Sequence, residues 1–380
     1  MPLLSVIRFF GILISLVVLG VSAYLLWTWY SGDTLVDEEG DLTRIREYWR
    51  LWLGLVLLAW SFLGRFVVPF LLAKGDKRPA RFEHGDGQLV EGETGTIYVG
   101  EHGQGPVTIV LTHGWSLDSS VWGYTKEDIG SGVRLINWDL PGMGKSVPRD
   151  RVVIGLTTFA AELRRLIETR TGPEPVVLVG HSIGGMTIQT LARDHPDLFS
   201  RQVDGVVLLN TTYTNPLKTM ILSGLMQALR KPILEPAMRL TMLLQPIVWL
   251  MAWQSYLSGW THIANRFGFG KYVTRSQLNH VSLLTTRNSP GDQAKGNLAM
   301  FNWDATGALS DLNVPVLVIG GELDIVTKAE ASKAIAASSR LARLEIIEGV
   351  NHLGFLERPD LYSAAIANFA AEIQRRPPVP

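Results

Sequence analysis

The chain contains no cysteine, which excludes disulfide bonds, cysteine metal sites and a cysteine nucleophile. It also has no excess charge of either sign, because 35 basic residues balance 35 acidic ones. Such a balance gives no reason to expect nucleic acid as a partner. The sequence shows no internal repeat and no low-complexity tract, so the 380 residues are interpreted as conventional helices and strands.

Hydrophobic residues make up 47% of the chain and are concentrated near its start. Residues 9–30 carry no charge, and residues 51–73 carry only Arg65. A helix needs about 20 apolar residues to cross the hydrocarbon core of a bilayer. Residues 1–80 are therefore predicted to form a transmembrane hairpin with helices at about 9–30 and 51–73.

Basic residues near the ends of these helices indicate the orientation of the hairpin, because such residues favour the cytoplasmic side. Arg8 precedes the first run, and four basic residues follow the second: Lys74, Lys77, Arg78 and Arg81. We therefore predict a multi-pass membrane protein with both hairpin ends and the large domain in the cytoplasm. The alternative is a cleaved signal peptide, since residues 21–23 resemble a small-residue cleavage site.

Short apolar runs alternate with helical patterns in the remaining 300 or so residues. Six strands are predicted, at residues 107–111, 133–137, 175–179, 206–209, 314–319 and 344–347. Such strands, separated by helices, imply a mostly parallel sheet covered on both faces, with ligands at the carboxyl ends of the strands. Residues 213–304 show no strand pattern and are predicted to form a helical cap between two core segments, 81–212 and 305–380.

The segment Gly180-His181-Ser182-Ile183-Gly184 follows one of these strands and begins a helix. A serine on such a tight turn has a strained backbone and crowded neighbours, which small residues two positions before and after it relieve. The turn raises the hydroxyl above the sheet and places N–H groups where negative charge is stabilised. We expect Ser182 to be a nucleophile and His181 to be a packing residue. The alternative is a plain strand-to-helix turn.

Together with this turn, four further segments resemble the α/β-hydrolase superfamily, in particular its lipase- and esterase-like members with a helical cap. These segments are His113-Gly114-Trp115, the turn at 139–146, the loop at 321–324 and Asn351-His352. The resemblance covers the soluble part except the insertion. It implies the α/β-hydrolase fold and a triad in the order Ser182, Asp324, His352. Dehalogenases and epoxide hydrolases of this fold use an Asp nucleophile, so the serine here argues against those reactions.

Acyl-transfer chemistry gives each of these residues a role. His352 would accept the serine proton and return it to the leaving group, and Asp324 would orient the imidazole. The N–H groups of Trp115 and Ile183 are the expected oxyanion hole, with His113 and Gly114 beside the substrate. Other candidates stay open at lower rank: Glu322, Asp304 and Asp311 for the acid, and His84, His102, His195, His262 and His280 for the base.

The predicted cap is unusually apolar and holds five of the nine methionines in residues 216–260. Methionine-rich, aromatic surfaces adapt to apolar ligands, and Met220, Trp249 and Trp253 are expected to contact the substrate. The alternative is that these side chains only pack the cap onto the core. The expected partners are a lipophilic ester and the lipid bilayer. No metal or organic cofactor is implied, and the sequence indicates nothing about protein partners.

These observations predict a membrane-anchored serine hydrolase that cleaves lipophilic carboxylic esters, such as monoacylglycerols, through an acyl-enzyme on Ser182. The anchor would hold the site near a pool of lipid. A thioesterase, an amidase or an acyltransferase would use the same triad. An alternative of another class is a non-catalytic, membrane-tethered binding protein, against which the complete set of Ser, Asp and His argues.

Overall fold

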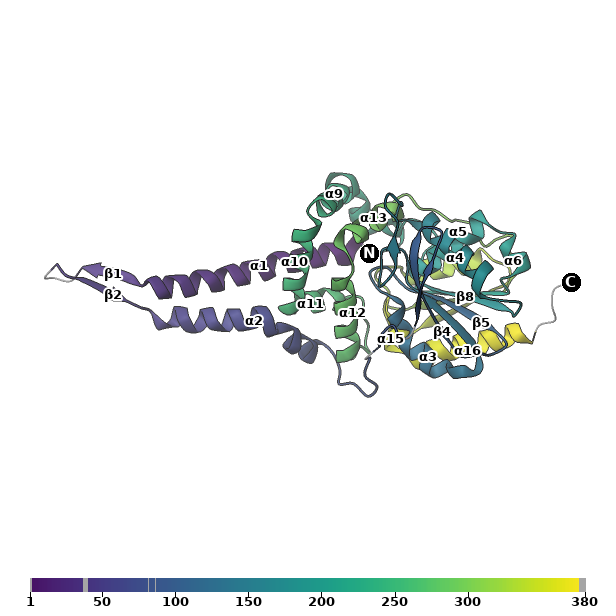
Figure 1. Cartoon of the computed structure of the whole chain (residues 1–380), viewed down its shortest axis with the longest axis horizontal. Helices are drawn as coiled ribbons and strands as arrows, with labels where there is room; N and C mark the ends of the chain where they lie inside the picture. The colour runs from purple at the N-terminus through teal and green to yellow at the C-terminus, as the bar shows by residue number, and fades with distance from the viewer. Residues whose placement is uncertain (1, 37–39, 81, 86, 376–380) are drawn as a thin grey trace.

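The computed structural model describes residues 2–36, 40–80, 82–85 and 87–375. A long helical hairpin projects from a globular α/β domain, and a layer of helices lies between the two (Figure 1). The hairpin consists of α1 (Pro2–Ser31) and α2 (Tyr48–Leu72). At its far end, β1 (Asp33–Val36) and β2 (Leu42–Ile45) pair antiparallel, which the sequence did not suggest.

Both hairpin helices are long and apolar enough to cross a membrane. The helix expected at 9–30 begins earlier, at Pro2, and therefore includes Arg8, which precedes the apolar run. The helix expected at 51–73 begins three residues earlier and ends at Leu72. The two helices approach closely at Gly54, whose carbonyl accepts a 2.8 Å hydrogen bond from the Ser22 hydroxyl.

The domain is built on a nine-stranded sheet of order β11-β10-β9-β8-β5-β6-β4-β3, with β7 paired to β4. The strands are β3 (Gln88–Glu91), β4 (Gly95–His102), β5 (Thr108–Thr112), β6 (Arg134–Trp138), β7 (Val147–Pro148), β8 (Val176–His181), β9 (Gly205–Leu209), β10 (Val316–Gly321) and β11 (Ala342–Ile347). All pairs from β11 to β6 are parallel, and β3, β4 and β7 pair antiparallel at one edge. The predicted mostly parallel sheet is confirmed. The antiparallel strands at its edge were not predicted from the sequence.

Helices cover both faces of the sheet, as the alternation along the buried strands requires. Val110 packs in one core cluster with residues of α4 (Leu156–Arg170) and α5 (Ile183–Asp194). Its neighbours Ile109 and Leu111 pack in the other cluster with residues of α3 (Gly123–Ile129) and α16 (Pro359–Gln374). Three shorter helices complete the core: α6 (Leu198–Arg201), α14 (Ala329–Ala337) and α15 (Gly354–Glu357).

Between β9 and β10 the described chain is helical, in the region expected as a cap. Its helices are α7 (Pro216–Thr219), α8 (Ser223–Leu229), α9 (Glu235–Leu243), α10 (Gln245–Leu257), α11 (Trp260–Arg266), α12 (Arg275–Arg287) and α13 (Pro290–Met300), with a π-helical turn at Arg230–Leu234 between α8 and α9. In Figure 1, α10, α11 and α12 lie against the half of the hairpin nearest the domain. Hydrogen bonds join the two parts, from Ser15 to Ser258 (Oγ–Oγ 2.8 Å) and from Gln254 to the Ser61 carbonyl (3.0 Å).

Candidate active site

Ser182 lies at the turn between β8 and α5 with φ 55° and ψ −116°. A positive φ is a strained conformation for a residue with a side chain, and two glycines make the turn possible. A Cβ on Gly184 would overlap the carbonyl of Thr112, and one on Gly180 would overlap the backbone of Gly184. The crowding expected around the Gly180–Gly184 turn is therefore present, and it fixes the serine at the carboxyl edge of the sheet.

The structure brings Ser182, His352 and Asp324 together from three different strand ends. The Oγ of Ser182 lies 3.0 Å from Nε2 of His352, and Nδ1 of His352 lies 3.0 Å from Oδ2 of Asp324. All three side chains are buried. In this geometry Asp324 accepts the Nδ1 proton, which leaves Nε2 as the acceptor for the serine hydroxyl. Glu322, the rival acid in the same loop, is exposed and accepts from the N–H of Gly349 instead.

Several donors hold the Asp324 carboxylate in its ionised form. Oδ2 accepts from Asn210 Nδ2 at 3.0 Å and from the Thr327 hydroxyl at 2.9 Å, and Oδ1 accepts from the N–H of Val326 at 2.8 Å. Burial alone would raise the pKa of Asp324, but the charge and hydrogen bond of His352, the backbone N–H of Thr327 and the amide of Asn210 hold the pKa below its ordinary value. Asn210 was not singled out from the sequence, although its position directly after a buried strand is a signal that could have identified it.

His181 packs beside the triad and does not take part in it. Its ring stacks near Phe355, with centroids 4.6 Å apart, and its Nε2 donates to the carbonyl of His352 at 2.9 Å. Burial lowers the pKa of His181 to about 3, so the ring stays neutral. His181 therefore holds the histidine loop in place, in agreement with the packing role expected for it.

Two backbone N–H groups near Ser182 are candidates for binding an oxyanion. Ile183 is the first residue of α5, and Trp115 lies in the turn after β5. Among the described residues, neither N–H donates to a protein acceptor. Unpaired N–H groups at a helix N-terminus favour negative charge. The assignment of this pair as the oxyanion hole stays a prediction.

A pocket opens beside Ser182, and its walls come from the core, the cap and the hairpin. Its lining combines triad-side residues with apolar and polar side chains of the cap and one residue of α1: Ser182, His181, His352, Leu353, Trp115, Leu117, Val281, Thr285, Asn265 and Arg8. Four of these ten side chains are apolar, and the open volume of the pocket is about 30 Å³, room for about one or two waters. Of these residues, sequence reasoning placed only Ser182, His352 and Trp115 at the site, and it missed the lining residues from the cap and the hairpin, Arg8 and Asn265 among them.

Three residues expected to touch the substrate lie elsewhere in the cap. Met220 is buried in a cap cluster with Leu217 and Phe301. Trp249 donates its indole N–H to the carbonyl of Thr286 at 2.8 Å, and Trp253 packs edge-on against Tyr256. None of the three lines the pocket beside Ser182. Their contact with the substrate therefore stays a prediction, since composition shows that a cap is apolar but not which of its faces is turned to the site.

His113 and Gly114 stabilise the segments that follow β5 and β6 next to the site. The His113 ring bridges the carbonyl of Gly114 (Nδ1, 2.8 Å) and the N–H of Leu140 (Nε2, 3.0 Å). Burial lowers the pKa of His113, so this ring is a neutral link between the ends of β5 and β6. Neither residue lines the pocket beside Ser182, so their contact with the substrate stays a prediction, while the hydrogen bonds of His113 give it a structural role.

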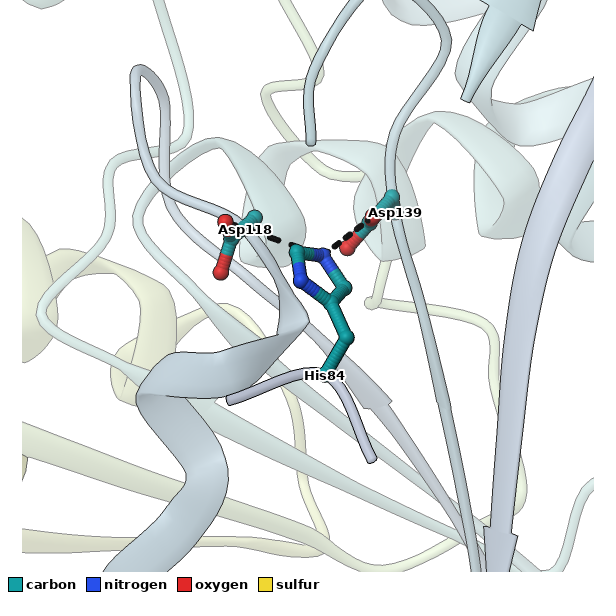
Figure 2. A group of neighbouring side chains, drawn as sticks. All are labelled: His84, Asp118 and Asp139. Atoms are coloured by element: carbon teal, nitrogen blue, oxygen red, sulfur yellow. Dashed lines mark hydrogen bonds and ion pairs between the residues drawn. The ribbon is translucent and has the colours of Figure 1, made fainter. Parts of the chain in front are cut away.

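A second group of polar side chains lies under the oxyanion loop. Figure 2 shows His84 between Asp118 and Asp139, with Nε2 of His84 2.8 Å from Oδ2 of Asp139 and 3.6 Å from Oδ2 of Asp118. The possible ligand atoms lie within 4.8 Å of one another. Three of the four carboxylate oxygens, however, accept backbone N–H groups, from Ser119, Ser120 and Lys145. We therefore interpret the group as a structural clamp between the segment after α2 and the core.

The fold and the site define a hydrolase of the Ser–His–Asp type, and sequence comparison agrees. The model of the Alpha/beta hydrolase family matches residues 109–365. The chain belongs to this family. The α/β-hydrolase fold predicted from the sequence is thereby confirmed.

Curated relatives of this chain are esterases. A pimeloyl-[acyl-carrier protein] methyl ester esterase of Nitrosospira multiformis is 26% identical over 290 residues, which cover 72% of this chain and 98% of the relative. The protein of the same name from Vibrio atlanticus is 23% identical over 284 residues, with the same coverage. These relatives confirm the predicted enzyme class, a serine hydrolase acting on ester bonds.

Solved structures share the fold. An esterase from Exiguobacterium antarcticum superposes with a TM-score of 0.60 at 20% identity and covers 75% of this chain and 99% of its own. A putative lipase from Acinetobacter baumannii gives a TM-score of 0.60 at 17% identity and covers 78% of this chain and 93% of its own. At such identities the likeness concerns the fold alone.

Proposed function

We propose that this protein is a membrane-anchored serine esterase that cleaves lipophilic carboxylic esters through an acyl-enzyme on Ser182. The observation that carries the proposal is the pair of 3.0 Å contacts that link Ser182 to His352 and His352 to Asp324. A serine hydroxyl is a weak nucleophile unless a base takes its proton, and this arrangement supplies the base and its orienting acid.

The proposed reaction proceeds in two halves. His352 Nε2 takes the proton of Ser182 as Oγ attacks the ester carbonyl, and the N–H groups of Trp115 and Ile183 stabilise the oxyanion. The imidazolium then protonates the departing alcohol, which leaves an acyl group on Ser182. Water enters, gives a proton to His352 and attacks the acyl carbonyl, so that the carboxylic acid departs and the serine proton is restored.

The exposed face of the cap supports a lipid environment. α9 and α10 present large apolar side chains to the outside beside the hairpin, among them Leu243 at 77% and Leu250 at 72% exposure, with Leu240 and Ile247 also exposed. Large contiguous apolar surfaces are unusual on soluble proteins and mark interaction sites. A bilayer adjacent to α1 and α2 would cover this face, and an acyl ester could reach the pocket from it.

The length of α1 beyond its hydrogen bond to the cap indicates how deeply the cap would sit in a bilayer. The cap holds α1 as far as Ser15, and α1 ends at Ser31. The 16 residues beyond Ser15 span about 24 Å at 1.5 Å per residue, less than the roughly 30 Å of a hydrocarbon core. If the hairpin spans the bilayer, the cap must touch or enter the hydrocarbon, where its exposed leucines are stable.

The contacts between α1 and the cap also bear on whether the N-terminal segment is cleaved as a signal peptide. Cutting near Ala23 would remove Arg8 and Ser15, both hydrogen-bonded to the cap. We therefore favour a retained hairpin with its two ends, and the large domain, in the cytoplasm. A reporter fused after Pro380 is expected to be active in the cytoplasm, and activity only outside it would reverse this topology.

The names of the curated relatives suggest one type of ester that the proposed substrate class should include. They are methyl ester esterases that act on a pimeloyl chain carried by a protein. For the present chain we propose esters of medium or long acyl chains with small alcohols as substrates, with methyl esters and monoacylglycerols as members of that class.

Activity profiling of the full chain in detergent tests the proposal. Among p-nitrophenyl esters from acetate to palmitate, kcat/KM is expected to hold or rise with acyl length, and Ser182→Ala is expected to abolish turnover. A strong preference for acetate over octanoate would contradict the lipophilic substrate. Faster cleavage of matched thioesters or amides would assign one of the other acyl-transfer reactions, and a folded protein without any turnover would indicate a binding protein.

A further inference from the structure

Arg8 brings a positive charge from the hairpin into the pocket of the nucleophile. It lies in the second turn of α1 and lines the same pocket as Ser182 and His352. Its side chain is half-buried against the cap. Neighbouring Val6 packs against the cap cluster and Ile7 against Val326. This end of α1 is therefore part of the wall of the active site.

The cap fixes the direction of the Arg8 side chain. Nε and Nη2 both donate to Oδ1 of Asn265, at 3.2 and 2.7 Å. The amide nitrogen of Asn265 in turn donates to Ser282 Oγ and Thr285 Oγ1, each at 3.1 Å. Because a guanidinium only donates, the amide oxygen of Asn265 must face Arg8, and the two hydroxyls accept from the amide nitrogen. The guanidinium is thus held in one orientation before any ligand binds.

The charge of Arg8 has no counter-ion in the described part of the chain. No described carboxylate lies within ion-pair distance of it, and its hydrogen-bond acceptor is a neutral amide. A charge withdrawn from water without a partner is costly. Arg8 also retains N–H groups beyond the two that bind Asn265, because a guanidinium has five donors. An anion in the pocket would use those donors and offset the charge.

A simpler role would be that of a charge flanking a membrane helix. Such a residue extends its head group toward water at the lipid boundary. Arg8 instead makes two directed hydrogen bonds to a buried cap residue and lies in a pocket with the nucleophile. A flanking charge needs neither feature, so the placement of Arg8 favours a ligand.

We propose that Arg8 is a specificity-determining residue of this site, and that the ester it selects carries an anionic group, a carboxylate or a phosphate, within reach of the guanidinium. The inference rests on the proposed esterase function and adds the charge of the substrate to it. The acyl chain would lie along the apolar walls formed by Leu117, Val281 and Leu353, with the anion at the Arg8–Asn265 end.

Two matched substrate pairs test this inference and separate the two sources of the anion. The carboxylate pair is monomethyl against dimethyl dodecanedioate. The phosphate pair is a lysophosphatidic acid against the monoacylglycerol with the same acyl chain. Each pair is measured with wild type, with Arg8→Gln, which keeps a donor for Asn265 but removes the charge, and with Arg8→Lys, which keeps the charge. Arg65→Gln, the loss of the corresponding charge from α2, is the matched control because Arg65 does not line the pocket.

The measured quantity is the ratio of kcat/KM for the anionic substrate to kcat/KM for its neutral partner. Arg8→Gln is expected to lower this ratio ~10-fold or more in one pair, the size of one hydrogen bond to a charged group. Arg8→Lys should retain part of the ratio, and Arg65→Gln should retain all of it. The pair that responds identifies the carboxylate or the phosphate.

Equal ratios in wild type and Arg8→Gln for both pairs would overturn the inference, as would equal losses in Arg8→Gln and Arg65→Gln. Failure of the proposed function itself gives a different result. In that case Ser182→Ala would hydrolyse all four esters at the wild-type rate, or wild type would hydrolyse none of them.

Discussion

Asn210 Nδ2 donates a 3.0 Å hydrogen bond to Oδ2 of Asp324, the oxygen that also faces Nδ1 of His352. Asn210 has a positive φ of 44°, and its own Oδ1 accepts from the hydroxyl of Tyr362 at 2.9 Å. The asparagine is thereby fixed on both sides. It acts as a positioning residue that keeps the carboxylate ionised and aimed at the histidine.

Replacing Asn210 by Ala should weaken catalysis through Asp324. Loss of one hydrogen bond to a buried carboxylate corresponds to about 1.5–3 kcal/mol, so kcat/KM is expected to fall ~10-fold or more. Because the lost donor helps to lower the pKa of Asp324, the acidic fall of activity should begin at higher pH than in wild type. Tyr362→Phe, which removes only the bond to Asn210, is the control with a smaller effect. A pH–rate profile of Asn210→Ala that superimposes on the wild-type profile would refute this role.

Replacing Gly184 by Ala should distort the nucleophile turn. The added Cβ overlaps the carbonyl of Thr112, and overpacking of this kind destabilises by about 1–3 kcal/mol. Thermal unfolding should occur at lower temperature, and labelling of Ser182 should slow. Gly224→Ala in α8 is the matched control, because its Cβ would meet nothing within 4 Å. Equal stability and labelling in the two variants would contradict the crowding argument.

His84 should stabilise the fold in a pH-dependent way. Burial opposes its charge, but the hydrogen bond and the charge of Asp139 raise the pKa of His84, with Asp118 adding to the effect and Lys145 opposing it. A group whose pKa is raised on folding contributes stability below its unfolded pKa of about 6.5, and loses it as the pH rises through the folded value. His84→Gln should therefore lower the unfolding free energy by about 1–3 kcal/mol at pH 6 and by less at pH 9. His102→Gln, at an exposed site, is the control. A loss of unfolding free energy in His84→Gln that is equal at pH 6 and pH 9 would contradict this role of His84.

The exposed leucines of the cap should matter only when the substrate lies in a membrane. Leu243→Glu with Leu250→Glu places two charges on the face proposed to meet the hydrocarbon, where charge is costly. The ratio of activity on vesicle-borne esters to activity on dispersed short esters should fall severalfold. Val153→Glu changes a side chain that is 77% exposed on the core and is the control. An unchanged ratio in the double variant would place the bilayer elsewhere.

The sheet and the triad could be predicted because both depend on local patterns. Apolar runs predicted all six strands of the parallel part, and Ser182, Asp324 and His352 stand in the segments that follow β8, β10 and β11. The antiparallel edge was not predicted. β3 and β7 are short and largely exposed, whereas β4 is eight residues long and mostly buried and was missed although its apolar residues form a strand pattern. The place of Arg8 in the pocket, and of Met220, Trp249 and Trp253 outside its lining, could not be predicted for a different reason. Their positions depend on how helices far apart in the chain pack together, which neither periodicity nor composition encodes.

The central claim is that the imidazole of His352 makes Ser182 the nucleophile. Labelling with a fluorophosphonate followed by peptide mass spectrometry tests it directly. The account predicts one adduct, on Ser182, that disappears in Ser182→Ala and forms at least ~100-fold more slowly in His352→Ala, since an unassisted hydroxyl reacts poorly. An adduct on another serine, or equal labelling rates in wild type and His352→Ala, would contradict it.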